Sequence, residues 1–253
     1  MRSKAVIGLL AVAASVALGA GARADDYANV HTVSVIVALD PAVTLREMSM
    51  LEFTEGEPQS FLPKTDFNGV IRHYVETALA TRFTVVPPAP AALNLARLHG
   101  DDFRAALGTL RGTGVDAYVF VFPGYRSYGR INWSGFGLDK NSDSATTLYT
   151  LFSISAFDAR TGANIDYGSS KFHGGGVFGG VFTLQTCDAA LWPGAKAPLA
   201  ADRQATVEAE ILAAIKESVP EALSGAGLPD QTGYTPTSHS GDALVPGGHC
   251  HRG

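Results

Sequence analysis

Hydrophobic and polar residues follow one another along the chain in patterns that predict several β-strands. Val33–Leu39 is apolar on both faces, which is typical of a strand inside a sheet. Val115–Phe122 is a strongly hydrophobic run and predicts a second buried strand. Thr146–Phe157 alternates between apolar residues and Thr, Ser or Tyr, which predicts an antiparallel strand with one buried and one wetter face. Its partner is expected at Ala163–Phe172, after a turn at Asp158–Gly162.

Other stretches repeat their apolar residues at helical spacing. After Asp66, a residue type that favours helix N-caps, apolar side chains recur every three or four positions up to Leu79. Two short Ala/Leu-rich helices are expected at Ala91–Leu98 and Asp101–Leu110. A longer helix is expected at Ala200–Ser218.

Two further regions predict short strands. Phe83–Val86 predicts a strand that the following prolines end. The stretch from Thr44 to Leu62 predicts a hairpin, with strands at Thr44–Met48 and Met50–Thr54.

This order of elements predicts one α/β domain with a mixed parallel and antiparallel sheet flanked by helices. Helical crossovers between strands favour parallel pairing, and the hairpins add antiparallel pairs. We place this domain at residues 25–228. Residues 229–253 are rich in Gly, Pro and Ser and lack periodicity, which predicts a flexible tail.

The first 24 residues have the features of a secretory signal peptide. Arg2 and Lys4 precede a short apolar run, and Ala22-Arg23-Ala24 provides a small-residue cleavage site. The alternative is an uncleaved membrane anchor, but the apolar run is short for a span of about 20 residues. We therefore expect cleavage after Ala24 and a periplasmic or secreted protein. No later stretch reaches about 18 unbroken apolar residues, so no integral membrane span is expected after cleavage.

Composition and charge narrow the functional classes. The chain has 46% hydrophobic and 17% charged residues, which excludes bulk disorder. Its 19 Lys and Arg against 24 Asp and Glu give a net charge of −5. Removal of the signal peptide takes away three basic residues and leaves about −8. Such a chain has no basic field for nucleic acid, so no nucleic-acid partner is expected.

The usual catalytic and cofactor motifs are missing from the sequence. It contains no G-x-S-x-G, H-E-x-x-H, C-x-x-C or Walker motif, and we expect no cofactor. Gly174–Gly180 is interpreted as a flexible loop or a close backbone approach. We interpret the neighbouring acids as solvated faces: Glu52, Glu55, Glu57, Asp139 and Asp143. Asp116, at the start of a buried strand, is expected to accept hydrogen bonds from nearby backbone amides.

An aromatic and basic segment follows the central strand. Its candidate partner-binding residues are Tyr125, Arg126, Tyr128, Arg130 and Trp133. Loops at the carboxyl ends of such strands carry binding sites, and these residue types anchor interfaces. The alternative is a β-extension whose aromatic side chains cover the sheet. The sequence leaves both interpretations open.

The two cysteines suggest a disulfide. Outside the cytoplasm Cys187 and Cys250 are expected to oxidise to one another. The alternative is a metal site at the tail, with His249 and His251 as ligands beside Cys250 and with His239 upstream. Adjacent residues of an extended chain point in opposite directions, which disfavours a site made from all three neighbours.

Three segments together resemble a known group of proteins. They are the strands Val33–Leu39 and Val115–Val121 and the strand with its turn at Ser155–Gly162. The chain resembles uncharacterised secreted bacterial proteins and, more distantly, periplasmic α/β domains of curli-channel and penicillin-binding-protein-activator type. The resemblance spans about residues 30–170 and implies a domain that binds partners and builds assemblies rather than an enzyme. The lipid-anchor cysteine usual in the distant groups is missing here.

These observations predict an exported, non-catalytic envelope protein with a binding or assembly role. Its expected partner is an envelope protein or a cell-wall component, and its oligomeric state is left open. Two alternatives remain at this stage: a periplasmic hydrolase with an unrecognised site, and a metal-handling protein that uses the C-terminal His/Cys tail.

Overall fold

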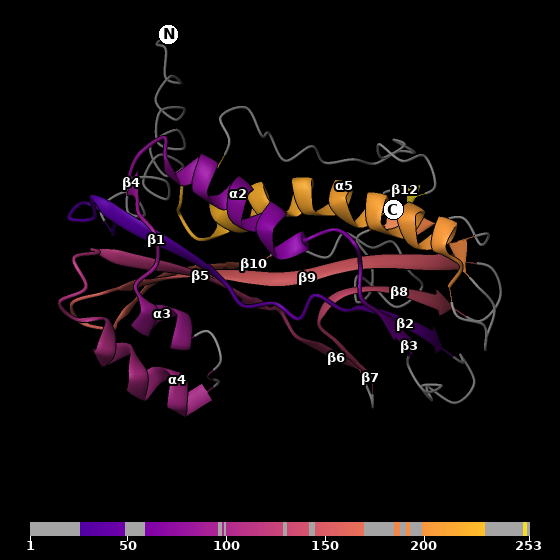
Figure 1. The fold of residues 1–253 in the computed structure, drawn as a ribbon, viewed down its shortest axis with the longest axis horizontal. Helices are drawn as coiled ribbons and strands as arrows, with labels where there is room; N and C mark the ends of the chain where they lie inside the picture. The colour runs from indigo at the N-terminus through magenta and orange to yellow at the C-terminus, as the bar shows by residue number, and fades with distance from the viewer. Residues whose placement is uncertain are drawn as a thin grey trace, which may run out of the picture.

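The chain folds as a single α/β domain with a mixed sheet and helices on both of its faces (Figure 1). This confirms the predicted fold class. The computed structural model describes residues 26–48, 59–95, 98, 100–128, 131–141, 145–169, 185–187, 191–192, 199–230 and 250–251.

The main sheet has ten strands. Seven follow the order β3-β2-β8-β9-β5-β1-β4, β10 and β11 also pair with β9, and β12 pairs with β11. The strands of this sheet are β1 (Thr32–Val37), β2 (Val43–Met48), β3 (Gln59–Phe61), β4 (Thr84–Val85), β5 (Ala117–Pro123), β8 (Gly135–Asn141), β9 (Ala145–Asp158), β10 (Asn164–Ser169), β11 (Gln185–Cys187) and β12 (Cys250–His251). The first half of β9 pairs with β8 and β11, and its second half pairs with β5 and β10. This 14-residue strand therefore joins the two halves of the sheet.

Parallel pairs form where helices cross over between strands. β1 runs parallel to both β4 and β5. The helix α2 (Phe67–Leu79) lies between β1 and β4 in the chain, and the short helices α3 (Pro90–Leu95) and α4 (Gly100–Ala106) lie between β4 and β5. The predicted crossovers are thus confirmed. β2 also runs parallel to β8, a pairing that the sequence pattern did not reveal.

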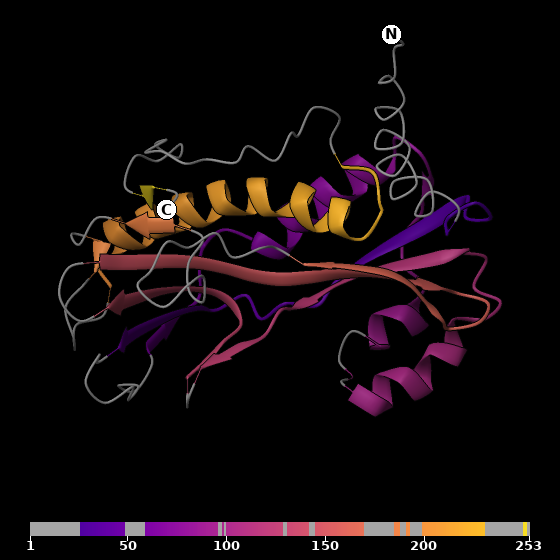
Figure 2. The same cartoon turned by 180° about the vertical axis from the view of Figure 1, so that it is seen from behind.

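The helices form a layer on each side of the sheet. α2 and α5 (Ala201–Gly225) cover one face, and α3, α4 and the 3-10 helix η1 (Leu107–Leu110) cover part of the other (Figures 1 and 2). As expected, Asp66 is the N-cap of α2, and its carboxylate accepts the amide of Gly69 at 2.9 Å. The main core lies under α2 and α5, and a second, aromatic-rich core lies under α3 and α4.

Helix α5 extends beyond the predicted end at Ser218. It passes through Pro220 and ends at Gly225. Proline inside a helix removes a backbone hydrogen bond and costs about 3 kcal/mol. Val219, Ala222 and Leu223 are all buried in the main core, and this packing keeps the last turns helical.

Strand β9 also differs from its prediction. It is antiparallel to its neighbours, as expected, but the side chains on its polar face are buried from solvent. Thr147, Ser153 and Ser155 on that face are 3%, 6% and 7% exposed. The alternation of polar and apolar residues therefore indicated the pleat of the strand correctly but not its solvation.

Two other predictions meet the structure only in part. The strand predicted at Thr44–Met48 is β2, and its antiparallel partner is β3; the predicted strand Met50–Thr54 lies outside the described residues. In the predicted C-terminal tail, residues 231–249 also lie outside the described residues. Cys250 and His251, however, form strand β12 on the main sheet, so this end of the tail is ordered.

Candidate functional site

The aromatic segment after β5 is a β-hairpin rather than a loop. β6 (Arg126–Tyr128) and β7 (Ile131–Trp133) pair antiparallel as a separate two-stranded sheet. The hairpin leaves the main sheet on the side of α3 and α4, away from α2 and α5 (Figures 1 and 2). The loop prediction is therefore wrong for this segment, and the alternative of a β-extension describes its backbone.

Trp133 anchors the root of this hairpin. Its side chain is 1% exposed, and its Nε1 donates a hydrogen bond to Oδ2 of Asp139. The guanidinium of Arg46 lies over the indole ring, 5.6 Å from its centroid, which is a cation–π distance. Trp133 is therefore covered in the folded chain and holds the hairpin in place from the inside.

Strand pairing brings these three side chains together. The parallel register of β2 and β8 pairs Arg46 with Asp139, and only one residue separates β7 from β8. Arg46 is 5% exposed and Asp139 is 2% exposed, so the interpretation of Asp139 as a solvated carboxylate is wrong. We call Arg46, Trp133 and Asp139 the root cluster. Buried charges of this kind need partners, and here an arginine, a carboxylate and an indole N–H lie side by side.

A close approach of β8 and β9 flanks the root cluster. Gly137 and Tyr149 are register partners, and Tyr149 is fully buried. A Cβ atom at Gly137 would overlap the ring of Tyr149, so the ring requires glycine at this position. The root cluster thus rests against a closely packed part of the sheet.

The structure describes the other candidate residues of this segment to different extents. Tyr125, just before β6, is 68% exposed. Arg126 and Tyr128 are placed in β6 by their backbone, with Arg126 opposite Trp133 in the register. Arg130 lies outside the described residues. The structure therefore separates an exposed residue, Tyr125, from the buried anchor, Trp133.

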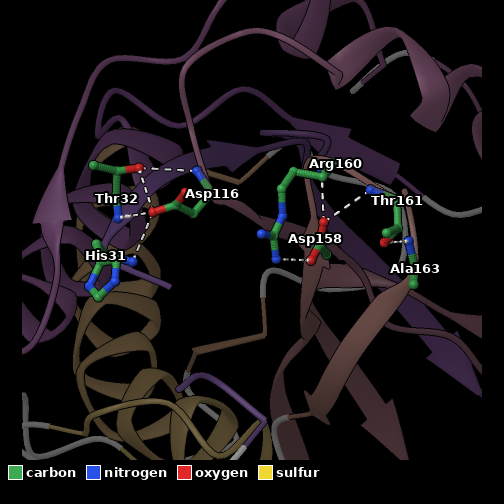
Figure 3. Close-up of polar contacts among 7 residues, drawn as sticks. All are labelled: His31, Thr32, Asp116, Asp158, Arg160, Thr161 and Ala163. Atoms are coloured by element: carbon green, nitrogen blue, oxygen red, sulfur yellow. Dashed lines mark hydrogen bonds and ion pairs between the residues drawn. The ribbon is translucent and has the colours of Figure 1, made fainter. Parts of the chain in front are cut away.

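A second polar centre lies where β1 and β5 begin (Figure 3). Oδ2 of Asp116 accepts hydrogen bonds from the amides of His31 and Thr32, both at 2.9 Å, and from the Thr32 hydroxyl at 3.0 Å. The same hydroxyl accepts the Asp116 amide at 3.0 Å. The amides of Thr32 and His31 lower the pKa of Asp116. The expected role of Asp116 as an acceptor for backbone amides is confirmed.

The turn between β9 and β10 lies in the same view and is closed by Asp158 (Figure 3). Its Oδ1 accepts the amides of Arg160 at 2.7 Å and Thr161 at 3.0 Å, and its Oδ2 accepts from the Arg160 guanidinium at 3.1 Å. Burial alone would raise the pKa of Asp158, but these hydrogen bonds outweigh it and lower the pKa. Gly162 has φ of 74°, which favours glycine and completes the turn. The predicted turn is confirmed.

Glu208 on α5 also accepts hydrogen bonds from backbone amides, here from the residues just before α2. Its carboxylate accepts the amides of Lys64 and Thr65 at 3.0 and 3.1 Å and the Thr65 hydroxyl at 2.7 Å. Burial acts to raise its pKa, and the hydrogen bonds from Thr65 and Lys64 bring the pKa below its ordinary value. Asp116, Asp158 and Glu208 therefore each join chain segments through backbone amides. The sequence pattern did not predict this role for Glu208.

The cysteines form the expected disulfide. Cys187 and Cys250 are bonded to one another and pair in register between β11 and β12. The bond removes the Cys250 thiolate from any metal site. His251 is placed by its backbone in β12, and His249 and His239 lie outside the described residues. Within the ranges that the structure describes, no three His, Cys, Asp or Glu side chains come together as metal ligands would.

Comparisons with protein families, curated proteins and solved structures give no match for this chain. No helix in the described part of the chain is both long enough and apolar enough to cross a membrane.

Proposed function

We propose that the protein is an exported, non-catalytic envelope protein that binds a partner through the β6–β7 hairpin. The observation that carries this proposal is the contrast between two side chains at the base of the hairpin. Its root is fixed by the buried contact of Trp133 with Asp139 and Arg46, while Tyr125 beside it is 68% exposed. Binding residues are commonly found on a projecting segment that a rigid scaffold positions.

The residue types in and beside the hairpin support a role in partner binding. Tyr, Trp and Arg dominate the binding energy of protein interfaces, and a tyrosine has little rotamer freedom to lose on binding. The segment from Pro123 to Gly137 contains two arginines and no acidic residue, within a chain of net charge −5. A partner protein or cell-wall polymer with an acidic surface fits this local charge.

Two observations support export. The N-terminal segment has the features of a signal peptide, and disulfides persist in oxidising compartments.

The folded body begins close to the expected cleavage position. Tyr27 is 1% exposed and its hydroxyl donates to the carbonyl of Ala226 at 2.8 Å. The folded body therefore includes residues close to the cleavage position after Ala24. N-terminal sequencing of the exported protein should give Asp25, whereas Met1 retained in a membrane pellet would contradict both cleavage and export in soluble form.

Site-specific crosslinking tests the binding site. A photo-reactive phenylalanine analogue at position 125 should form adducts in the native envelope, and the same analogue at Arg72, exposed on α2, should not. The adduct is then identified by mass, or by co-sedimentation when it is a wall polymer. Its affinity should fall about 5- to 30-fold in Tyr125→Ala, because interface anchors contribute more than about 1 to 2 kcal/mol. Equal labelling at both positions, or unchanged affinity, would refute the proposal.

A further inference from the structure

The disulfide joins two strands that are too short to pair stably by themselves. β11 has three residues and β12 has two, and Cys187 and Cys250 lie opposite one another in the register. In the described part of the chain, β12 pairs with β11 alone. Two residues form few backbone hydrogen bonds, so a strand of this length depends on further contacts to stay at a sheet edge. The S–S bond is therefore the main link that keeps β12 in the sheet.

Both sulfur-bearing residues are buried in the folded chain. Cys187 is 4% exposed and Cys250 is fully buried, and both belong to the main core together with Trp192 and Leu199. Thiol–disulfide exchange requires a thiolate to reach one of the two sulfur atoms. The folded chain therefore protects the bond from thiol reductants.

Two residues between Cys187 and α5, Trp192 and Leu199, form hydrogen bonds with the first turn of α5. Arg203 Nη1 donates to the carbonyl of Trp192 at 3.1 Å, and Gln204 Nε2 donates to the carbonyl of Leu199 at 2.8 Å. These bonds tie Trp192 and Leu199 to the helix that covers this face of the sheet (Figure 1). Docking of α5 and burial of the disulfide are thus parts of one packing event.

We propose that closure of the Cys187–Cys250 bond is a redox-controlled step of folding that precedes the docking of α5. The two cysteine thiols lose two protons and two electrons as the S–S bond forms. The oxidant is the disulfide of a thiol oxidoreductase. This disulfide takes up the two protons and two electrons and is reduced to a dithiol. The chain then completes its sheet only in a compartment that holds such an oxidant.

Reduction kinetics of the unmodified protein test the burial step. Folded and urea-unfolded samples are treated with the same concentration of dithiothreitol, and free thiols are alkylated and counted by mass over time. Reduction should be at least about 100-fold slower in the folded sample, because it requires opening of the core. Equal rates in both samples would overturn the proposal.

Hydrogen exchange tests the dependence of the sheet on the bond. In the Cys187→Ala/Cys250→Ala variant, amides of β11, of the first half of β9 and of α5 should lose protection, while amides of β5 should keep theirs. A reduced wild-type chain refolded without oxidant should give the same pattern, and refolding with an oxidised dithiol should restore protection. Full protection of β11 in both the double alanine variant and the reduced wild-type chain would refute the proposal. If the variant does not fold, the wild-type samples alone decide the outcome.

Discussion

Buried and half-buried carboxylates tie the ends of elements together in this protein. Asp116 joins the starts of β1 and β5, Asp158 closes the turn after β9, and Glu208 holds the residues before α2. All three have pKa values below those of the free side chains. Backbone amides are the main cause for Asp116, and a side-chain hydrogen bond acts together with backbone amides for Asp158 and Glu208. Each therefore links protonation to the stability of a junction.

This link predicts how stability depends on acid. A carboxylate whose pKa is lower in the folded chain stabilises the fold at pH values above its unfolded pKa, about 3.9 for Asp and 4.3 for Glu. That stability is lost as the pH falls through the folded pKa. We expect the urea midpoint to be nearly constant from pH 7 to 5 and to fall below about pH 4. The Asp116→Asn variant should cost about 1 to 2 kcal/mol at pH 7 and show a shallower acid decline. A parallel decline in both proteins would contradict this role of Asp116.

Tyr27 predicts a complementary effect in alkali. Burial raises its pKa, and the charges of Asp166 and Asp26 raise it further. A group with a raised pKa stabilises the fold below its unfolded pKa, here about 10, and that stability is lost as the pH rises beyond it. The Tyr27→Phe variant loses the hydrogen bond to Ala226 and should cost about 1 kcal/mol at pH 7. Above about pH 10 the difference between the two proteins should shrink. Exposed Tyr125→Phe is the control, and a constant difference up to pH 11 would refute the assignment.

Among the elements, the β6–β7 hairpin is anchored by one buried side chain, that of Trp133. Trp133 is held by Asp139, and Arg46 lies over its ring. Trp133→Phe should cost about 2 kcal/mol, because it removes the N–H and leaves a buried carboxylate with one donor fewer. Asp139→Asn should have a similar cost, and the double variant should cost less than the two single variants together. Chemical denaturation of the four proteins measures this coupling.

The same variants separate anchoring from partner contact. Hydrogen exchange in β6 and β7 should quicken in Trp133→Phe, whereas Tyr125→Phe should leave both stability and exchange unchanged. Strictly additive costs, with no change of exchange in the hairpin, would show that Trp133 does not position it.

Local patterns predicted most of the elements but not the contacts between distant ones. Helical periodicity after Asp66 indicated α2, and the Asp158–Gly162 turn indicated the β9–β10 hairpin, because neighbouring residues decide both. The root cluster depends on the parallel pairing of β2 with β8, which brings Arg46 beside Asp139. No local signal marks that pairing. Tertiary packing likewise carries α5 past Pro220, where propensity alone predicts an end.

At the scale of the whole molecule, the described edges of the sheet are all protected from further strands. β4 has two residues and is followed by Pro87 and Pro88, and β3 has three residues. β12 is a two-residue edge fastened by the disulfide. Open edges recruit other chains, and short or interrupted edge strands prevent this. These short edges in the described part of the sheet therefore disfavour assembly by strand addition.

The β10 edge provides the last prediction, because the side chain of Asp166 covers one of its backbone amides. The register shifts between Asn164 and Asp166, and Oδ1 of Asp166 accepts the Tyr167 amide at 2.7 Å, so that this amide is closed to an incoming strand. Tyr167 itself is 54% exposed. Asp166→Val removes the hydrogen-bond acceptor and the negative charge, and we expect the variant to associate more strongly than the wild type at concentrations of about 100 μM.

Asp166→Asn is the matched control, because its amide oxygen still accepts the Tyr167 amide while the negative charge is gone. Sedimentation velocity over a concentration series should show association in the valine variant and none in the asparagine variant. Association of both variants would assign the effect to charge rather than to the covered amide. A valine variant that associates no more than the wild type would show that the bulge protects β10 without help from Asp166.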